Sequence, residues 1–158
     1  MQFHPQLEVL EPRDAPTSGW SVQSTPPRVT LAQEQAVIVR AFAAWEAVAN
    51  IPANVPVTFR AAPIDGFGKR LAETAWNGTE FIITLDTAER WVSSMRRVPN
   101  AIDLNRVILH EIGHALRLPH TTAPYGMNIM NPQWSWAVST LGPLDKAAVL
   151  AIYGAPNG

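Results

Sequence analysis

Three of the four histidines in this chain stand within eleven residues of one another. His110 and His114 are one helical turn apart, so a helix places both imidazoles on one face, where they can bind a single ion. His120 follows Pro119, which indicates that the helix has ended and that the chain can turn back to offer a third imidazole. Three nitrogen ligands leave a fourth tetrahedral position for water, which is typical of a catalytic zinc site.

Glu111 follows the first of these histidines, close enough to act on a water bound to the same ion. A zinc ion lowers the pKa of its water and polarises a carbonyl, and a carboxylate can take the water's proton and pass it to a leaving amine. The motif therefore predicts peptide-bond hydrolysis through a zinc-activated water, with Glu111 as general base. HExxH also occurs by chance in ordinary helices, and the fourth histidine, His4, is given no role in the site.

The composition excludes several other kinds of protein. With 12 Lys and Arg against 13 Asp and Glu, the 158-residue chain has a formal net charge of -1 and no broad basic surface for nucleic acid or an anionic membrane. Cysteine is absent, so nitrogen or oxygen atoms must bind any metal. No apolar run reaches the length of a membrane span, and the start of the chain lacks the features of a secretory signal. We expect a soluble monomer, secreted if an export signal has been removed.

Three helices follow from periodicity and capping. Thr30 begins a capping box, and apolar residues then recur at helical spacing until Pro52. Asn100 is expected to cap a second helix, which runs through Leu116 and carries the first two histidines of the site. Residues 144–153 form the third predicted helix, closed by a glycine.

Short segments rich in β-branched and aromatic residues predict three strands, at residues 55–60, 71–76 and 81–85. The pair Asn77-Gly78 predicts a tight reversal that makes the last two strands antiparallel neighbours. Residues 1–19 are rich in proline and predict an extended arm, a candidate pro-segment, ahead of one domain over residues 20–158. Together these elements predict an α+β fold with a small twisted mixed sheet and two packed helices.

The motif HEIGHALRLPH, with Met130 ten residues after its last histidine, resembles the HExxHxxGxxH signature and Met-turn of the metzincin metalloproteases. Among metzincins the chain resembles most a minimal matrixin, the catalytic-domain type of the matrix metalloproteinases. Residues 41–48, 85–91 and 144–154 resemble the first helix, the segment after the last strand and the closing helix of that family. The resemblance implies a metzincin-like fold, one catalytic zinc bound by the three histidines, and a peptide or protein substrate.

The resemblance also implies where a substrate binds. Leu71 and Ala72 begin a segment that resembles the edge strand on which a matrixin binds an extended peptide through backbone groups. Pro132 and Trp134 match the wall of the main pocket on the primed side of the scissile bond, although Trp134 is nearly as well explained as a core residue. Asp14 stands where a matrixin latency segment has its zinc-covering cysteine, so it is a candidate latency ligand; the alternative is a proline-rich surface arm.

Arg117 departs from the family pattern, because it stands where the signature has glycine. The backbone must leave the helix there through a positive φ, which costs a residue with a Cβ about 1–2 kcal/mol. Either Arg117 bears this strain, or the turn is built differently and His120 is displaced. One alternative to an endopeptidase is therefore a metal-binding interaction module of the same fold, catalytically weak or inactive because of Arg117 or because its own arm occupies the site. A separate alternative is a zinc amidase acting on a non-protein substrate.

Two further departures concern other metal ions. The histidines of the family's structural zinc would fall near Glu73 or Thr74 and at Thr84, so we expect no second zinc. Asp86 and Glu89 match calcium ligands of the family, but the turn between the two last strands is too short to supply further oxygens. We therefore expect no calcium, and we interpret both carboxylates as part of a helix start.

Overall fold

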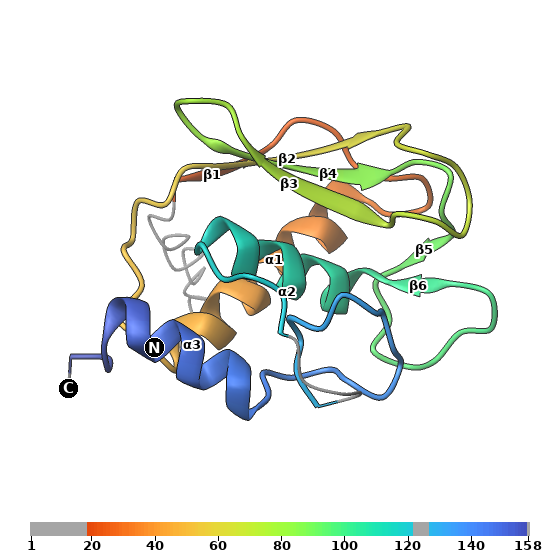
Figure 1. Cartoon of the computed structure of the whole chain (residues 1–158). Helices are drawn as coiled ribbons and strands as arrows, with labels where there is room; N and C mark the ends of the chain where they lie inside the picture. Colours follow the sequence, from red (N-terminus) through yellow and green to blue (C-terminus); the bar gives the residue numbers. More distant parts are fainter. Residues whose placement is uncertain (1–18, 122–126, 158) are drawn as a thin grey trace, which may run out of the picture.

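The computed structural model describes residues 19–121 and 127–157 as a twisted sheet above two helices (Figure 1). The four-stranded sheet has the order β1-β2-β4-β3, so β3 lies at an edge. β1 pairs with β2 and β2 with β4 in parallel, whereas β3 and β4 are antiparallel, so the sheet is mixed. The strand bounds are Trp20–Val22 (β1), Val57–Ala62 (β2), Ala72–Trp76 (β3) and Phe81–Asp86 (β4).

Three helices accompany the sheet, and the predicted α+β class is confirmed. α1 (Leu31–Glu46) and α2 (Leu104–Ala115) pack against each other beneath the sheet, and α3 (Pro143–Tyr153) lies beyond them (Figure 1). The indole Nε1 of Trp45, which is fully buried, donates to the backbone oxygen of Leu109 at 3.0 Å and so ties α1 to α2. None of the helices in the described ranges combines the length and apolar character needed to cross a bilayer.

Local signals identified most of the helix ends correctly. The hydroxyl of Thr30 accepts from the amide of Gln33, whose side chain accepts in return from the amide of Thr30, so the predicted capping box is present. α3 ends at Gly154, whose φ of 73° is in the left-handed region.

The expected start of the second helix is wrong. Asp103 caps α2 by accepting from the amide of Asn105, whereas Asn100 lies three residues earlier in a turn, with a φ of 56°. Asp103 is also the second residue of β6 (Ile102–Asp103), which pairs in parallel with β5 (Trp91–Val92). Asn100 has a side chain that can cap a helix, but residues 102 and 103 pair with β5 as a strand, so the helix begins only at Leu104.

The interpretation of Asp86 and Glu89 as a helix start is also wrong. Residues 87–89 form a turn, and both carboxylates instead accept from backbone amides of the loop between β2 and β3. Asp86 accepts from the amides of Asp65 and Gly66 at 3.3 Å, and Glu89 accepts from the amide of Gly68 at 2.6 Å. Burial alone would raise the pKa of Asp86, but the backbone amides that surround it lower the pKa overall. Because this loop lies against both carboxylates, the shortness of the turn between β3 and β4 is no argument against calcium.

Glu34 predicts a measurable pH dependence of stability. Its side chain is buried in α1, and within the described ranges neither carboxylate oxygen has a hydrogen-bond partner. Burial raises the pKa of Glu34 from 4.5 to about 7. The folded state therefore holds a proton that the unfolded state has lost, and stability falls as the pH rises from 4.5 through 7. Urea unfolding measures how much Glu34→Gln exceeds the parent chain in free energy of unfolding. This excess should be about 2–3 kcal/mol larger at pH 8 than at pH 5. An advantage independent of pH would contradict this account.

Candidate metal centre

Three imidazoles converge at the surface of α2. The Nε2 atom of His120 lies 3.2 Å from Nε2 of His110 and 3.1 Å from Nε2 of His114. Nitrogen ligands at about 2.0–2.1 Å from a tetrahedral zinc stand about 3.3 Å from one another. One ring nitrogen of each histidine lies within 4.8 Å of the others, so the spacing predicted from the sequence produces a metal-binding geometry.

The hydrogen bonds of the rings show that a cation fits this group. The Nδ1–H of His110 donates to the backbone oxygen of Ile129 at 2.7 Å, and that of His114 donates to the oxygen of Leu118 at 2.9 Å. Burial lowers the pKa of His110 to about 4, and burial also lowers the pKa of His120. With Nδ1 protonated in the neutral rings, the Nε2 lone pairs of His110 and His114 both face His120, which can supply at most one proton. A divalent metal ion satisfies all three nitrogens at once.

Arg117 adopts the positive φ that the family pattern requires of this position. Its φ is 66°, and α2 ends in a Schellman motif, in which the amide of Leu118 donates to Gly113 and the amide of Arg117 donates to His114. The turn is therefore built as the signature implies, with the strain on Arg117, and His120 still reaches the other two rings. The alternative of a displaced third histidine is wrong.

The strain at Arg117 leads to a prediction on stability. Arg117→Gly relieves the left-handed backbone but increases the freedom of the unfolded chain, so we expect a gain of up to about 1 kcal/mol in urea unfolding. Arg117→Ala is the matched control, because it keeps the strain and removes the guanidinium that lies 5.7 Å from the centre of the Phe81 ring. If alanine stabilises as much as glycine, strain at this position is not the cause.

A buried segment at Ile129 and Met130 contacts the metal centre through His110. Met130 is fully buried, and a Cβ on Gly113 would lie 2.3 Å from its sulfur, so a larger residue at this position of α2 would displace Met130. The buried carboxylate of Asp145 accepts from the amides of Ile129, Met130 and Gly142 at 2.6, 3.0 and 2.7 Å. Because the oxygen of Ile129 accepts from His110, Asp145 anchors a zinc ligand through one peptide unit. Asp145 was not predicted as a site residue, because its only local signal is its place in the first turn of α3.

Glu111 lies beside the three rings with 6% of its surface exposed. Its Oε2 accepts from the hydroxyl of Thr74 on β3 at 2.6 Å. Burial raises the pKa of Glu111, whereas the hydrogen bond from Thr74 acts in the opposite direction. The sequence did not predict the contact between Thr74 and Glu111, because no local pattern indicates that β3 packs on α2.

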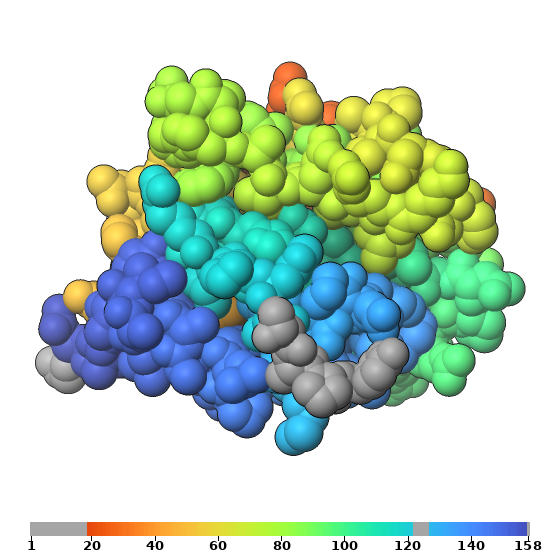
Figure 2. Space-filling view, in the orientation of Figure 1, coloured from red at the N-terminus to blue at the C-terminus, as the bar shows by residue number. Residues whose placement is uncertain are grey.

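A groove runs over the metal centre and brings the predicted site residues together. Its lining includes Leu71 and Ala72, Pro132 and Trp134, the three histidines and Glu111. In the space-filling view, the green surface of the β3–β4 hairpin lies above the cyan surface of α2, and the blue C-terminal part lies below (Figure 2). Trp134 is partly buried and packs against the hydrophobic core, and its role as a pocket wall stays a prediction. Asp14 falls outside the described residues, and its latency role stays a prediction.

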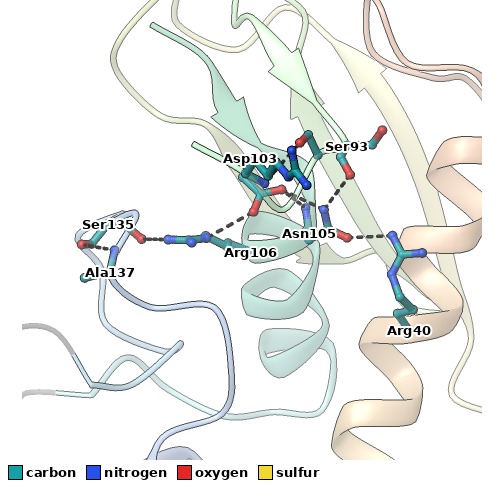
Figure 3. A network of polar contacts seen from close by, with 9 residues as sticks. Arg40, Ser93, Asp103, Asn105, Arg106, Ser135 and Ala137 are labelled. Carbon is teal, nitrogen blue, oxygen red and sulfur yellow. Dashed lines mark hydrogen bonds and ion pairs between the residues drawn. The ribbon is translucent and has the colours of Figure 1, made fainter. Parts of the chain in front are cut away.

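Arg106 links α2 to Ser135, which lines the groove (Figure 3). Its Nε donates to Oδ2 of Asp103 at 3.2 Å, and its NH1 donates to the backbone oxygen of Ser135 at 2.6 Å. The guanidinium also lies 5.0 Å from the centre of the Trp136 ring. Asn105 continues the network by accepting from Arg40 at 2.8 Å, which ties the start of α2 to α1. No role was predicted for Arg106, because its partners on the groove side, Ser135 and Trp136, lie about 30 residues away in the sequence.

The comparison with known proteins agrees with this geometry. The family model described as Matrixin matches residues 13–154. The probable matrix metalloproteinase 095L of Invertebrate iridescent virus 3 is 38% identical over 93 residues, which cover 58% of this chain and 25% of that protein. Metalloendoproteinase 1 of Glycine max is 34% identical over 107 residues, which cover 56% of this chain and 35% of that protein. This chain thus spans only a quarter to about a third of the length of these relatives. Family match and histidine geometry together show that the chain belongs to the matrixin family of zinc metallopeptidases.

Proposed function

We propose that this chain is a zinc-dependent endopeptidase that hydrolyses peptide bonds in extended protein segments. The observation that carries the proposal is the convergence of three imidazole Nε2 atoms beside the carboxylate of Glu111, on the floor of an open groove. His110, His114 and His120 would hold the ion. When bound, zinc supplies a Lewis acid that polarises the scissile carbonyl and lowers the pKa of water.

Glu111 is the general base of the proposed reaction. Its buried carboxylate accepts a proton from the attacking water and then delivers a proton to the nitrogen of the leaving amine. Burial raises the pKa of Glu111, and a higher pKa makes its carboxylate a better acceptor of the proton of water in the first of these transfers. Because Glu111 lies one residue from His110 on α2, the same helix sets the positions of the base and the metal ligands.

The groove suits a peptide in an extended conformation. β3 is the edge strand of the sheet, and the edge not paired with β4 offers backbone groups that can pair with a peptide of any sequence. In this proposal Leu71 and Ala72 contact the peptide along that edge, and Pro132 and Trp134 form the wall of the pocket for the primed side chain. All these groups belong to one chain, so the proposed catalytic unit is a monomer.

Metal removal and restoration test the proposed function. We expect the protein to cleave an unstructured protein such as casein, to lose activity in a chelator, and to regain it on addition of zinc. The readout is the appearance of new amino termini, together with zinc content. A protein that binds one zinc but cleaves neither casein nor a peptide library is the interaction module described above. Release of product from non-protein amides alone identifies a zinc amidase.

A further inference from the structure

Thr74 is joined to the general base by a short hydrogen bond that crosses from the sheet to the helix. Its Oγ1 lies 2.6 Å from Oε2 of Glu111 and 3.2 Å from the backbone oxygen of the same residue. A threonine hydroxyl has one proton, and the carboxylate oxygen is the nearer and more strongly charged acceptor. The hydroxyl therefore donates to Oε2.

This bond leaves the two oxygens of Glu111 unequal. Oε2 is engaged by Thr74, so Oε1 is the oxygen that remains to exchange a proton with the attacking water or the leaving amine. A carboxylate at the end of a flexible side chain otherwise rotates between several orientations, and only some of them point at the reacting atoms. The bond to Thr74 selects one orientation before the substrate binds.

The position of Thr74 on β3 also connects the base to the substrate. Ala72 and Thr74 stand two residues apart on the edge strand, so their side chains share the face that packs on α2. The neighbouring residue Glu73 points to the other face. A peptide that pairs with the edge of β3 would hold this strand in place. Thr74 on the same strand holds the carboxylate of Glu111 through its hydrogen bond.

From this geometry we propose that Thr74 is a positioning residue. It holds the carboxylate of Glu111 in its reactive orientation and at a fixed position relative to β3, the strand that binds the peptide. This role rests on the proposed endopeptidase function. Thr74 acts through Glu111 and contacts neither the metal ligands nor the scissile bond.

Replacement of Thr74 by valine tests the role, because valine has the same shape without the hydroxyl. We expect Thr74→Val to lower kcat about 10- to 100-fold, as for loss of a hydrogen bond to a charged group, with KM changed less than about 2-fold. Thr74→Ser, which retains the hydroxyl, should recover kcat to within about 3-fold of the parent chain. Zinc content should be the same in all three proteins, and the melting temperature of Thr74→Val should fall by only a few degrees, because a single hydrogen bond is lost.

Thr58 provides a matched control. Its Oγ1 donates to Oε2 of Glu80 at 2.6 Å, the same length and chemistry as the bond between Thr74 and Glu111. It stands on β2, which β4 separates from β3. Thr58→Val should therefore leave kcat unchanged. If Thr74→Val does not fold, Thr74→Ala replaces it.

The outcomes separate this proposal from the proposed function. The positioning role is overturned if Thr74→Val retains full kcat, if it raises KM alone, or if Thr74→Ser is as impaired as Thr74→Val. In each case the parent chain still cleaves peptides and Glu111→Gln still abolishes cleavage. If the parent chain loaded with zinc cleaves nothing, the endopeptidase function itself fails.

Discussion

Glu111→Gln should lower kcat for peptide cleavage about 10²- to 10⁴-fold while the protein still binds one zinc. The amide has nearly the shape of the carboxylate and can still accept from Thr74, so the helix and the histidines should be undisturbed. An amide cannot take a proton from water at neutral pH, which removes the base but not the metal ligands. The measurement compares kcat with zinc content in the same preparation.

Glu80→Gln is the control for that experiment. Glu80 also accepts from a threonine hydroxyl at 2.6 Å, but it lies at the end of the turn between β3 and β4 and should not affect kcat. Cleavage by Glu111→Gln at more than a tenth of the parent rate would remove Glu111 from the role of base. Loss of zinc from the variant would instead show that Glu111 helps to bind the ion.

Asp145→Ala should have the largest effect on stability. Three backbone amides, those of Ile129, Met130 and Gly142, lose their acceptor in a buried site. Each buried amide without a partner costs about 1–3 kcal/mol, and these costs overlap, so we expect a loss of about 3–5 kcal/mol in urea unfolding. Asp145→Asn keeps one acceptor oxygen and should fall between the alanine variant and the parent chain.

The same substitution should weaken zinc binding. The Ile129–Met130 peptide, whose amide donates to Asp145, carries the carbonyl that accepts from Nδ1 of His110, and loss of such a supporting group typically costs 10- to 100-fold in metal affinity. Competition with a chromogenic chelator measures this affinity. Lys146→Ala changes the exposed neighbour on α3 and serves as control. Unchanged stability and affinity in Asp145→Ala would contradict the anchoring of His110 through residue 129.

The parts of the fold that were predicted correctly depend on signals within a few residues. The capping box at Thr30 and the Asn77-Gly78 turn between β3 and β4 act over a single turn of chain, and both are present. β1 was missed because its three residues become a strand only by pairing with β2. The cap of α2 was assigned to Asn100 because the sequence did not reveal the pairing of β6 with β5.

The site shows the same division. The spacing of His110, His114 and His120 specifies a metal-binding group, because a helix and the turn after it set the distances between the rings. The groups that support the site come from segments far away in the chain: Thr74 lies 37 residues from Glu111, and Asp145 lies 16 residues from Ile129. Such contacts depend on how the elements pack, which no local pattern in one sequence specifies.

Anomalous diffraction at the zinc absorption edge, on crystals of the zinc-loaded protein, tests the central claim most directly. The account predicts one peak about 2.0–2.1 Å from Nε2 of each of His110, His114 and His120, with the fourth position facing the groove. No peak at this site, or a peak bound by His110 and His114 while His120 points elsewhere, would contradict it.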